Sequence, residues 1–470
     1  MQKFKLHTHY KKLLADTTTP VSIYLRLRDI FPNSLLLESS DYHSRDNSLS
    51  YICCEPIAGV VLNRGILQEK YPDGSQATFD VGQFNLVNQI DAFLKRFEAD
   101  TLPLKVISSG LFGYFTHEAV EHFETITLKK LADDARRVPE MQYHIYRYII
   151  AIDHFKNELY IFENHFGEAA VDGDGIEKMQ YLLKSKDFPE YYFQTKDTEQ
   201  SNLTDEGFMA IVEKMKQHIY RGDVFQIVPS RAFSQAFGGD EFNVYRALRS
   251  INPSPYLFYF DYGDFRIFGS SPEAQITIKN RVASIYPIAG TFKRTGNDEK
   301  DAEAAKALEN DPKESAEHVM LVDLARNDLS RHCENVAVKA FKQVQYYSHL
   351  IHLVSHVSGT LKPDVSSFKI VADTFPAGTL SGAPKFRAME IIDENENIKR
   401  SFYSGAIGYL GFNGDFNHAI MIRSLLSKNG VLHYQAGAGI VADSVAESEL
   451  NEVSNKVAAL RKAIEMAQEL

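Results

Sequence analysis

Short apolar runs separated by polar turns dominate the chain up to about residue 165. The runs at 34–40 and 50–54 predict two strands with a polar turn at 41–48 between them. Residues 147–153 and 158–163 predict a hairpin that turns at 154–157. The spacing at 91–98 favours a helix instead. This part of the chain is therefore expected to combine many strands with few helices.

A clear helix opens the second part of the chain. Thr204 is a suitable N-cap, apolar residues between 208 and 219 recur at helical spacing, and Gly222 ends the pattern. Later helices are predicted at 301–310, 314–332 and 444–468. Strands are predicted at 224–228, 265–269, 274–279, 282–286, 404–410, 418–425 and 431–435. The turns between the later strands contain Asn-Gly pairs, which are typical of hairpins.

Hairpin-connected strands with helices in separate stretches indicate an α+β fold. We predict large antiparallel β-sheets packed as a sandwich with flanking helices. A chain of 470 residues is long for one hydrophobic core, so two regions are expected. The change in composition at 185–203 predicts a linker, with a smaller N-terminal region at 1–190 and a larger domain at 200–467.

The net charge of the chain limits the kinds of molecule that it is expected to bind. There are 51 Lys and Arg against 62 Asp and Glu, a net charge of −11, which disfavours nucleic acid and anionic membranes as partners. The three cysteines include no C-x-x-C motif, a pattern typical of a reducing compartment. The first residues lack the apolar core of a signal peptide, and no apolar run reaches about 18 residues. We therefore expect a soluble cytoplasmic protein.

Two acidic pairs lie at helical spacing, Glu314 with Glu317 and Glu449 with Glu452. Each pair places both carboxylates on one helix face, and convergence of the two faces would create a hard-oxygen site suited to Mg²⁺. Such pairs are also common on solvated helix surfaces, and spacing alone favours that interpretation. Lys456 lies one turn after Glu452, where a surface ion pair and contact with an anionic substrate both remain open.

Several polar residues interrupt apolar runs. Arg423 lies in Ile420–Ser424 and Gln226 in Val224–Val228, where each needs a partner from the protein or from a ligand. His352 lies in a similar run, and a lone histidine there is more often a core residue than a catalyst. Glycine-containing loops at 287–291, 379–385 and 437–440 are consistent with tight turns or with backbone amides that approach an anion.

The order of these features resembles the chorismate-utilising enzymes from about residue 201 to the C-terminus. The matching stretches are Gly222-Asp223-Val224-Phe225-Gln226, Gly269-Ser270-Ser271-Pro272-Glu273, Pro287-Ile288-Ala289-Gly290-Thr291, and residues 317–328, 379–385 and 435–441, followed by Glu452 and Lys456. Gln226 stands where water-adding members carry Lys, which implies ammonia as the nucleophile. Ala289 stands where aminodeoxychorismate-forming members carry a covalently acting Lys. The resemblance therefore points to the branch of anthranilate synthase component I.

The resemblance also implies roles for single residues. Mg²⁺ would be held by Glu317 and Glu452, with Glu314 and Glu449 reaching it through water. The substrate would be bound by Gly290, Thr291, Tyr409, Arg423, Gly437, Ala438, Gly439 and Lys456. Glu273 is expected to protonate the leaving hydroxyl group, Gln226 to serve the nucleophile, and His352 and Thr379 to line the pocket, with His352 aiding the loss of pyruvate.

The N-terminal region resembles the family's feedback site for L-tryptophan. The residues concerned are Glu38, Ser39, Asn252, Pro255, Tyr256 and Leu257, the last standing where Met is common. None of the cysteines lies in a glycine-rich elbow, so a separate glutamine amidotransferase subunit is expected to supply ammonia, in a heterodimer or heterotetramer. The alternatives are aminodeoxychorismate synthase component I, opposed by Ala289, isochorismate or salicylate formation, opposed by Gln226, and a non-catalytic sensor of tryptophan or chorismate.

Overall fold

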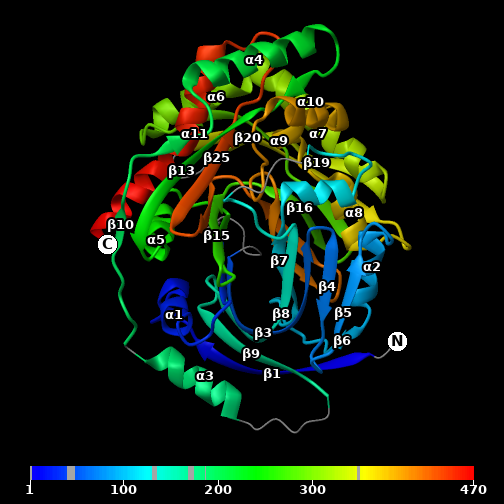
Figure 1. The fold of residues 1–470 in the computed structure, drawn as a ribbon, viewed down its shortest axis with the longest axis vertical. Coiled ribbons are helices and arrows are strands. Elements are labelled where there is room, and N and C mark those ends of the chain that lie inside the picture. The colour runs from blue at the N-terminus through cyan, green and yellow to red at the C-terminus, as the bar shows by residue number, and fades with distance from the viewer. Residues whose placement is uncertain (1–2, 40–47, 130–134, 168–173, 186, 347–349) are drawn as a thin grey trace.

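A computed structural model describes the chain except for residues 1–2, 40–47, 130–134, 168–173, 186 and 347–349, and except for the side chains at positions 289, 291, 293, 313 and 350. Helices and antiparallel strands occur throughout, so the predicted α+β class is confirmed (Figure 1). The predicted turn at 41–48 lies almost entirely outside the described residues. No helix of the described part is both long and apolar enough to span a membrane.

The helices lie mainly on the outside of the strands (Figure 1). They are α1 Pro20–Leu27, α2 Leu86–Leu94, α3 Asp174–Lys184, α4 Asp205–Tyr220, α5 Phe242–Ile251, α6 Asp298–Glu309, α7 Pro312–Ser330, α8 Ser367–Thr374, α9 Gly378–Ser381, α10 Lys385–Asn395 and α11 Ala446–Met466, with short 3₁₀ turns at His117–His122 and Ala467–Glu469. The predicted cap is confirmed, because the Thr204 side chain accepts a hydrogen bond from the Gly207 amide at the start of α4.

Most strands belong to one hydrogen-bonded set. They are β1 Phe4–Leu14, β2 Leu35–Glu38, β3 Leu49–Asn63, β4 Ile66–Lys70, β5 Gln76–Asp80, β6 Phe97–Ala99, β7 Gly110–Phe115, β8 Met141–Asp153, β9 Glu158–Phe166, β10 Phe193–Thr195, β11 Gln200–Ser201, β12 Gln226–Ile227, β13 Ser230–Gly239, β14 Tyr256–Asp261, β15 Phe265–Ser271, β16 Ala274–Lys279, β17 Val282–Ile285, β18 Ile288–Lys293, β19 Cys333–Tyr346, β20 Leu350–Leu361, β21 Gly382–Ala383, β22 Ala406–Gly411, β23 Phe416–Ile420, β24 Ser424–Lys428 and β25 Val431–Gly437. Strands β12 and β21 form a separate pair.

The two halves of the sequence share their sheets. Strand β2 pairs with β14, with Glu38 opposite Leu257, and β7 pairs with β22, with Phe112 opposite Tyr409. One apolar cluster also combines both halves, with Phe112 and Ile149 packed together with Phe258 and Met421. Burial of large side chains is the main favourable term in folding. The N-terminal and C-terminal regions therefore bury a common core.

Two predicted segments before residue 204 differ from the structure. The helix expected at 91–98 begins earlier, at Leu86, because the Asn85 side chain caps it through the Asn88 amide. Residues after its end form β6, which pairs in parallel with β1. The expected linker at 185–203 contains β10 and β11, both of which pair with β13. This connection is thus part of the sheet structure.

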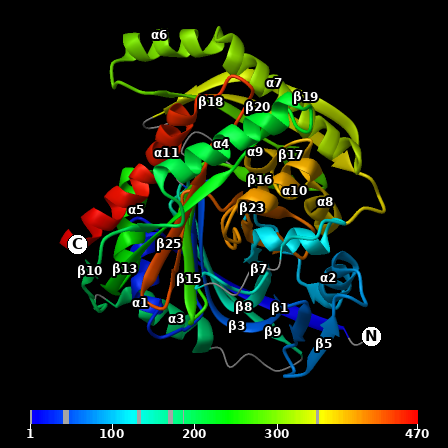
Figure 2. The same cartoon turned by 45° about the horizontal axis from the view of Figure 1, so that its top comes forward.

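The outer helices cover different parts of the C-terminal strands. Helix α11 packs against α4 and α5, whereas α6 and α7 pack against β18, β19 and β20. Figure 2 shows α6 and α7 at the top of the molecule, above these strands. This arrangement brings Glu317 of α7 to Gln226 in β12, and Lys456 of α11 to Gly437 at the end of β25.

Candidate active site

Glu273 lies in the short connection between β15 and β16, and several predicted residues surround it. The hydroxyl of Thr379, in α9, donates a hydrogen bond of 3.1 Å to Glu273 Oε1. Burial raises the pKa of Glu273 to about 7, while Thr379, Lys456 and Arg423 act in the opposite direction. A carboxyl group with this pKa can hold a proton near neutral pH and release it, which suits a general acid.

Arg423 reaches this position because the chain leaves the sheet. The predicted strand at 418–425 is wrong, since β23 ends at Ile420 and β24 begins at Ser424. Arg423 has a φ of 48°, a left-handed conformation that costs about 1–3 kcal/mol for a residue other than glycine. Its carbonyl accepts from the Ser270 amide at 3.1 Å, which ties this turn to the end of β15. Burial lowers the pKa of Arg423, and Glu273 partly opposes that effect.

His352 lies on β20 opposite β18. It is buried, and its Nδ1 donates to the Gly290 carbonyl at 2.9 Å. Burial lowers the pKa of His352, which favours the neutral imidazole. Gly290 has a φ of +70°, and a Cβ there would lie 2.5 Å from Leu308 and 3.1 Å from Glu314 Oε2. Glycine is therefore required both by conformation and by space. The Thr291 side chain lies outside the described part of the structure.

The Gln226 side chain lies between helix α7 and the glycine loop Gly437–Gly439. Its side chain is buried, and Nε2 donates to Glu317 Oε1 at 2.8 Å. A Cβ at Gly439 would lie 2.9 Å from Gln226 Nε2 and 3.9 Å from Glu317 Oε1. The amide of Gln226, the Glu317 carboxylate and the loop therefore meet at one place.

Lys456 approaches the same loop from α11. Its Nζ donates to the Gly437 carbonyl at 2.8 Å and lies 2.7 Å from Glu452 Oε1. Both side chains of this pair are nearly half exposed, whereas Glu449, one turn earlier, is buried. An exposed pair of this kind contributes little to stability, about 0–1 kcal/mol. The two charges are thus available to a ligand at small energetic cost.

The predicted magnesium ligands fit that ion by their chemistry. Among the described residues, no group of three or more His, Cys, Asp or Glu side chains is arranged to hold a metal ion. Glu317 nevertheless lies beside Gly439, and Glu452 pairs with Lys456, which donates to the Gly437 carbonyl, so each carboxylate already has a hydrogen-bond donor beside it. A carboxylate that can give up such a hydrogen bond is a suitable ligand for Mg²⁺, which usually binds one or two carboxylates directly.

Tyr409 lines a cavity whose described lining includes none of the other predicted substrate residues. It is part of β22, where Ile407 and Tyr409 share one face and line a separate cavity. Its role in binding the substrate stays a prediction. Tyr403, which the sequence analysis passed over, lies beside the predicted substrate loop, because a Cβ at Gly437 would be 3.1 Å from its hydroxyl oxygen. Tyr403 lies in a segment without regular periodicity, so only the order of nearby motifs could have identified it.

The separate cavity has a volume of about 450 Å³ and lies between β2, β14 and β22. It is lined by Glu38, Ser39, Pro255, Tyr256 and Leu257 of the predicted tryptophan site, together with Tyr409. Asn252 is not among the described lining residues, and its side-chain amide instead approaches Ser270 Oγ at 3.4 Å. The Glu38 carboxylate accepts hydrogen bonds from Tyr245 at 2.6 Å and Arg249 at 2.9 Å.

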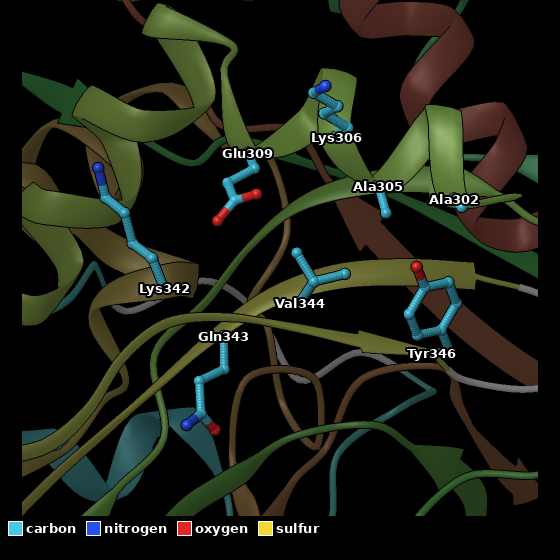
Figure 3. A pocket seen from close by; sticks show the side chains of 8 residues that line it. All are labelled: Ala302, Ala305, Lys306, Glu309, Lys342, Gln343, Val344 and Tyr346. Carbon is cyan, nitrogen blue, oxygen red and sulfur yellow. The ribbon is translucent and has the colours of Figure 1, made fainter.

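A third hollow is an open groove between α6 and β19 (Figure 3). Its volume is about 740 Å³, and Lys306, Glu309, Val344 and Tyr346 contribute to its walls. In Figure 3 these side chains come from the facing surfaces of the helix and the strand. None of its described lining residues belongs to the predicted sites. The residues predicted to act in the reaction therefore lie around Glu273, Gln226 and the Gly437–Gly439 loop, and none is among the described residues that line this groove.

A family profile described as chorismate binding enzyme matches residues 64–462. The chain belongs to the chorismate-binding enzymes. Two curated proteins named anthranilate synthase component 1, from Acetivibrio thermocellus and from Neisseria meningitidis serogroup C, are each 39% identical to it. Each alignment covers 98% of this chain and 95% of the relative. The predicted resemblance of this chorismate-binding enzyme to anthranilate synthase component I is confirmed.

Solved structures agree with this family assignment. The crystal structure of anthranilate synthase component I from Streptococcus pneumoniae TIGR4 matches with a TM-score of 0.76 and 30% identity, covering 96% of this chain and 99% of that one. The menaquinone-specific isochorismate synthase from Escherichia coli matches with a TM-score of 0.74 over 98% of this chain and 95% of its own. At 19% identity, this second likeness shows a shared fold alone.

Proposed function

We propose that this chorismate-binding enzyme aminates chorismate with ammonia and eliminates pyruvate to form anthranilate, the first step of tryptophan biosynthesis. The observation that carries the proposal is the convergence of Thr379, Arg423 and Lys456 on Glu273, whose pKa burial raises to about 7. The curated relatives of nearly full length, all named anthranilate synthase component 1, support the same reaction.

Binding comes first in the proposed mechanism. Chorismate carries two carboxylates, which an acidic protein of net charge −11 would repel without local positive charge. Arg423 would take one carboxylate, helped by the backbone amides of the Gly437–Gly439 loop, and Lys456 would take the other. Mg²⁺, held by Glu317 and Glu452, would add positive charge at the ring carboxylate. With its two carboxylates held in this way, the ring of chorismate would lie between Gly290 and Glu273.

The proposed proton transfers follow from the pKa values of Glu273 and His352. Glu273 would donate its proton to the leaving C4 hydroxyl group, because hydroxide leaves poorly without an acid. Gln226 does not titrate, so it would orient ammonia without competing with it for a proton. Neutral His352 would assist the loss of pyruvate, since an imidazole without a proton on one nitrogen can accept one. Thr379 would fix the orientation of the Glu273 carboxyl group.

The test of this proposal is a fluorescence assay of the purified chain with chorismate, ammonium and Mg²⁺. Appearance of anthranilate is expected without any added subunit, because free ammonia replaces the product of a glutamine amidotransferase. Consumption of chorismate to a different product would assign another branch, such as aminodeoxychorismate formation. No consumption in any condition would favour a non-catalytic binding protein.

The pH dependence of the reaction is expected to report Glu273. The acid form is required, so kcat/KM should be constant below pH 7 and fall about tenfold per pH unit above it. Rates are compared at a fixed concentration of free ammonia, because the ammonia fraction itself rises with pH. A profile without this alkaline limb between pH 6 and 9 would contradict the role of Glu273 as the acid.

We further propose that the cavity between β2, β14 and β22 binds L-tryptophan as a feedback inhibitor. Its volume of about 450 Å³ lies in the range of small-molecule sites, and its walls combine apolar and aromatic side chains with the buried Glu38. A carboxylate in such a place suits the ammonium group of an amino acid. Strand β14 leads from this cavity to β15, which ends just before Glu273, so occupancy of the cavity can act on the acid.

Replacing Glu38 with Gln is expected to raise the tryptophan concentration that halves the rate by at least about tenfold, because a charge-assisted hydrogen bond becomes a neutral one. The rate without tryptophan should stay within twofold of that of the unmodified enzyme. The measurement is an inhibition curve at fixed chorismate. As a control, Glu158→Gln changes an acidic residue on β9 outside the cavity and should leave the curve unchanged.

A glutamine amidotransferase subunit is the proposed source of ammonia in the assembled enzyme. The cysteines Cys53, Cys54 and Cys333 are all buried, and burial raises the pKa of each thiol. A thiol of this kind is a poor nucleophile, since the thiolate is the reactive form. The chain is therefore expected to convert ammonium but not glutamine, and glutamine-dependent turnover by the pure chain would contradict the need for a partner.

A further inference from the structure

Arg400 lies in the loop between α10 and β22, and its guanidinium group is almost completely buried, with the residue 3% exposed. It makes four hydrogen bonds in three directions. Nη1 donates to the Leu380 carbonyl at 2.7 Å, and Nη2 donates to the Val228 carbonyl at 2.7 Å and to Glu396 Oε1 at 2.8 Å. Nε donates to Glu396 Oε2 at 3.1 Å.

The two carbonyls belong to segments that carry proposed site residues. Leu380 follows Thr379 directly, and Val228 lies two residues after Gln226. The segments also contact each other, because the Val228 amide donates to the Ser381 carbonyl at 3.1 Å. Arg400 thus connects the segment of Gln226, whose amide is proposed to orient ammonia, to the segment of Thr379, whose hydroxyl holds Glu273.

Glu396, the partner of Arg400, extends this connection to the glycine loop. Its Oε1 accepts from the Ser230 amide at 2.9 Å and from the Ser230 hydroxyl at 2.7 Å. Ser230 lies opposite Gly437 in the β13–β25 pairing, and its hydroxyl also accepts from Gln435 at 2.7 Å. The buried pair therefore binds the backbone of three segments of the proposed site, at Val228, Ser230 and Leu380.

Stability alone is a weak explanation for such a pair. A buried ion pair can often be replaced by apolar residues of similar volume with little loss of stability, because the attraction between the charges offsets their lost hydration only in part. A planar guanidinium fork, by contrast, fixes the directions of the groups it binds. We infer that Arg400 and Glu396 are positioning residues, which set the distance between Gln226 and the Glu273–Thr379 pair. This inference rests on the proposed function.

The first test is Arg400→Lys, which keeps the charge beside Glu396 but loses the planar fork that reaches both carbonyls. Turnover should fall by about 10²-fold, the cost of a misplacement of roughly 1 Å. The loss is expected in kcat and in the KM for ammonium, while the KM for chorismate changes less than threefold, because Arg423 and Lys456 remain. Arg28→Lys is the matched control, since Arg28 forms a similar fork with Asp240 at 3.1 and 2.6 Å on another part of the chain.

A second variant separates positioning from folding. The double replacement Glu396→Leu with Arg400→Met removes both charges at similar volume and should fold, as thermal unfolding will show. Its kcat should nevertheless stay at least tenfold below that of the unmodified enzyme. Both variants should also show faster amide hydrogen exchange at 226–230 and 379–383, with no change in β1. This exchange measurement does not depend on the reaction.

The outcomes are distinct. A folded double variant with unchanged kcat would overturn the inference, and so would unchanged exchange at 226–230 and 379–383. If the unmodified chain consumes no chorismate, the proposed function fails, while the exchange result still decides whether the pair holds these segments in place. An equal loss of activity in Arg28→Lys would also overturn the inference, since the effect would then be general to buried arginine forks.

Discussion

Replacing Glu273 with Gln is expected to lower kcat for anthranilate formation by about 10²–10⁴-fold, the usual contribution of a positioned general acid. Gln has nearly the same shape and can still accept the hydrogen bond that Thr379 donates at 3.1 Å. It has no acidic proton for the leaving hydroxyl group, however. Because burial raises the pKa of Glu273 to about 7, the unmodified enzyme holds that proton in a large fraction of molecules at neutral pH.

The measurement is steady-state anthranilate fluorescence together with calorimetric titration of chorismate. Binding should persist, because Arg423 and Lys456 are unchanged. The control is Glu241→Gln, which alters another buried carboxyl group whose pKa is raised by burial but which lies beside Arg266 and Ser427, outside the site. If Glu273→Gln retains kcat within threefold, or loses chorismate binding altogether, the assignment of Glu273 as the acid is wrong.

Much of the site was predictable because its residues lie in long, specific stretches of sequence. Glu273, Gln226 and the loop at 437–439 each stand in such a stretch, and the structure brings all three around one region. The fold class was equally accessible, since hairpin turns and separate helical stretches are visible in the periodicity of the sequence. Local pattern is enough where a feature depends on neighbours in the sequence.

Features that depend on backbone conformation were not predictable. Ile420–Ile422 is apolar, so the segment around Arg423 was assigned to a strand, although the φ of 48° at Arg423 breaks the strand there. The same limit applies to the cavity that Tyr409 lines. The side chains of a strand alternate between two faces, but the sequence does not reveal which face meets the site and which meets the second cavity. That depends on pairing between β7 and β22, from distant parts of the chain.

The sharing of sheets between the two halves also links the cavity between β2, β14 and β22 to the segment of Arg423. Tyr256 and Leu257 line the second cavity and lie opposite Ser271 and Ser270 in the β14–β15 pairing. The Ser270 amide in turn donates a hydrogen bond to the Arg423 carbonyl. A domain arrangement with independent sheets would need a hinge or an interface for the proposed inhibition by tryptophan, whereas here paired strands join the two places.

Removal of divalent metal by EDTA is expected to abolish anthranilate formation, and excess Mg²⁺ to restore it. The physical reason is charge, because Glu317, Glu452, Glu314 and Glu449 would otherwise face a substrate with two carboxylates. Hard carboxylate oxygens are the ligands that suit Mg²⁺. The chain's own residues then divide into two groups by their expected effect on the Mg²⁺ concentration needed for half activity.

Replacing a direct ligand should have the larger effect. Glu317→Gln and Glu452→Gln are expected to raise the required Mg²⁺ concentration by more than about 100-fold, whereas Glu314→Gln and Glu449→Gln, which would act through water, should raise it by about 10–100-fold. The matched control is Glu447→Gln, an exposed residue in the first turn of the same helix α11. Glu452 also pairs with Lys456 at 2.7 Å, so its variant should raise the KM for chorismate as well. An equal Mg²⁺ requirement in all four variants and the control would mean that these carboxylates belong to a solvated surface, and the positive charge for chorismate would then have to come from Arg423 and Lys456 alone.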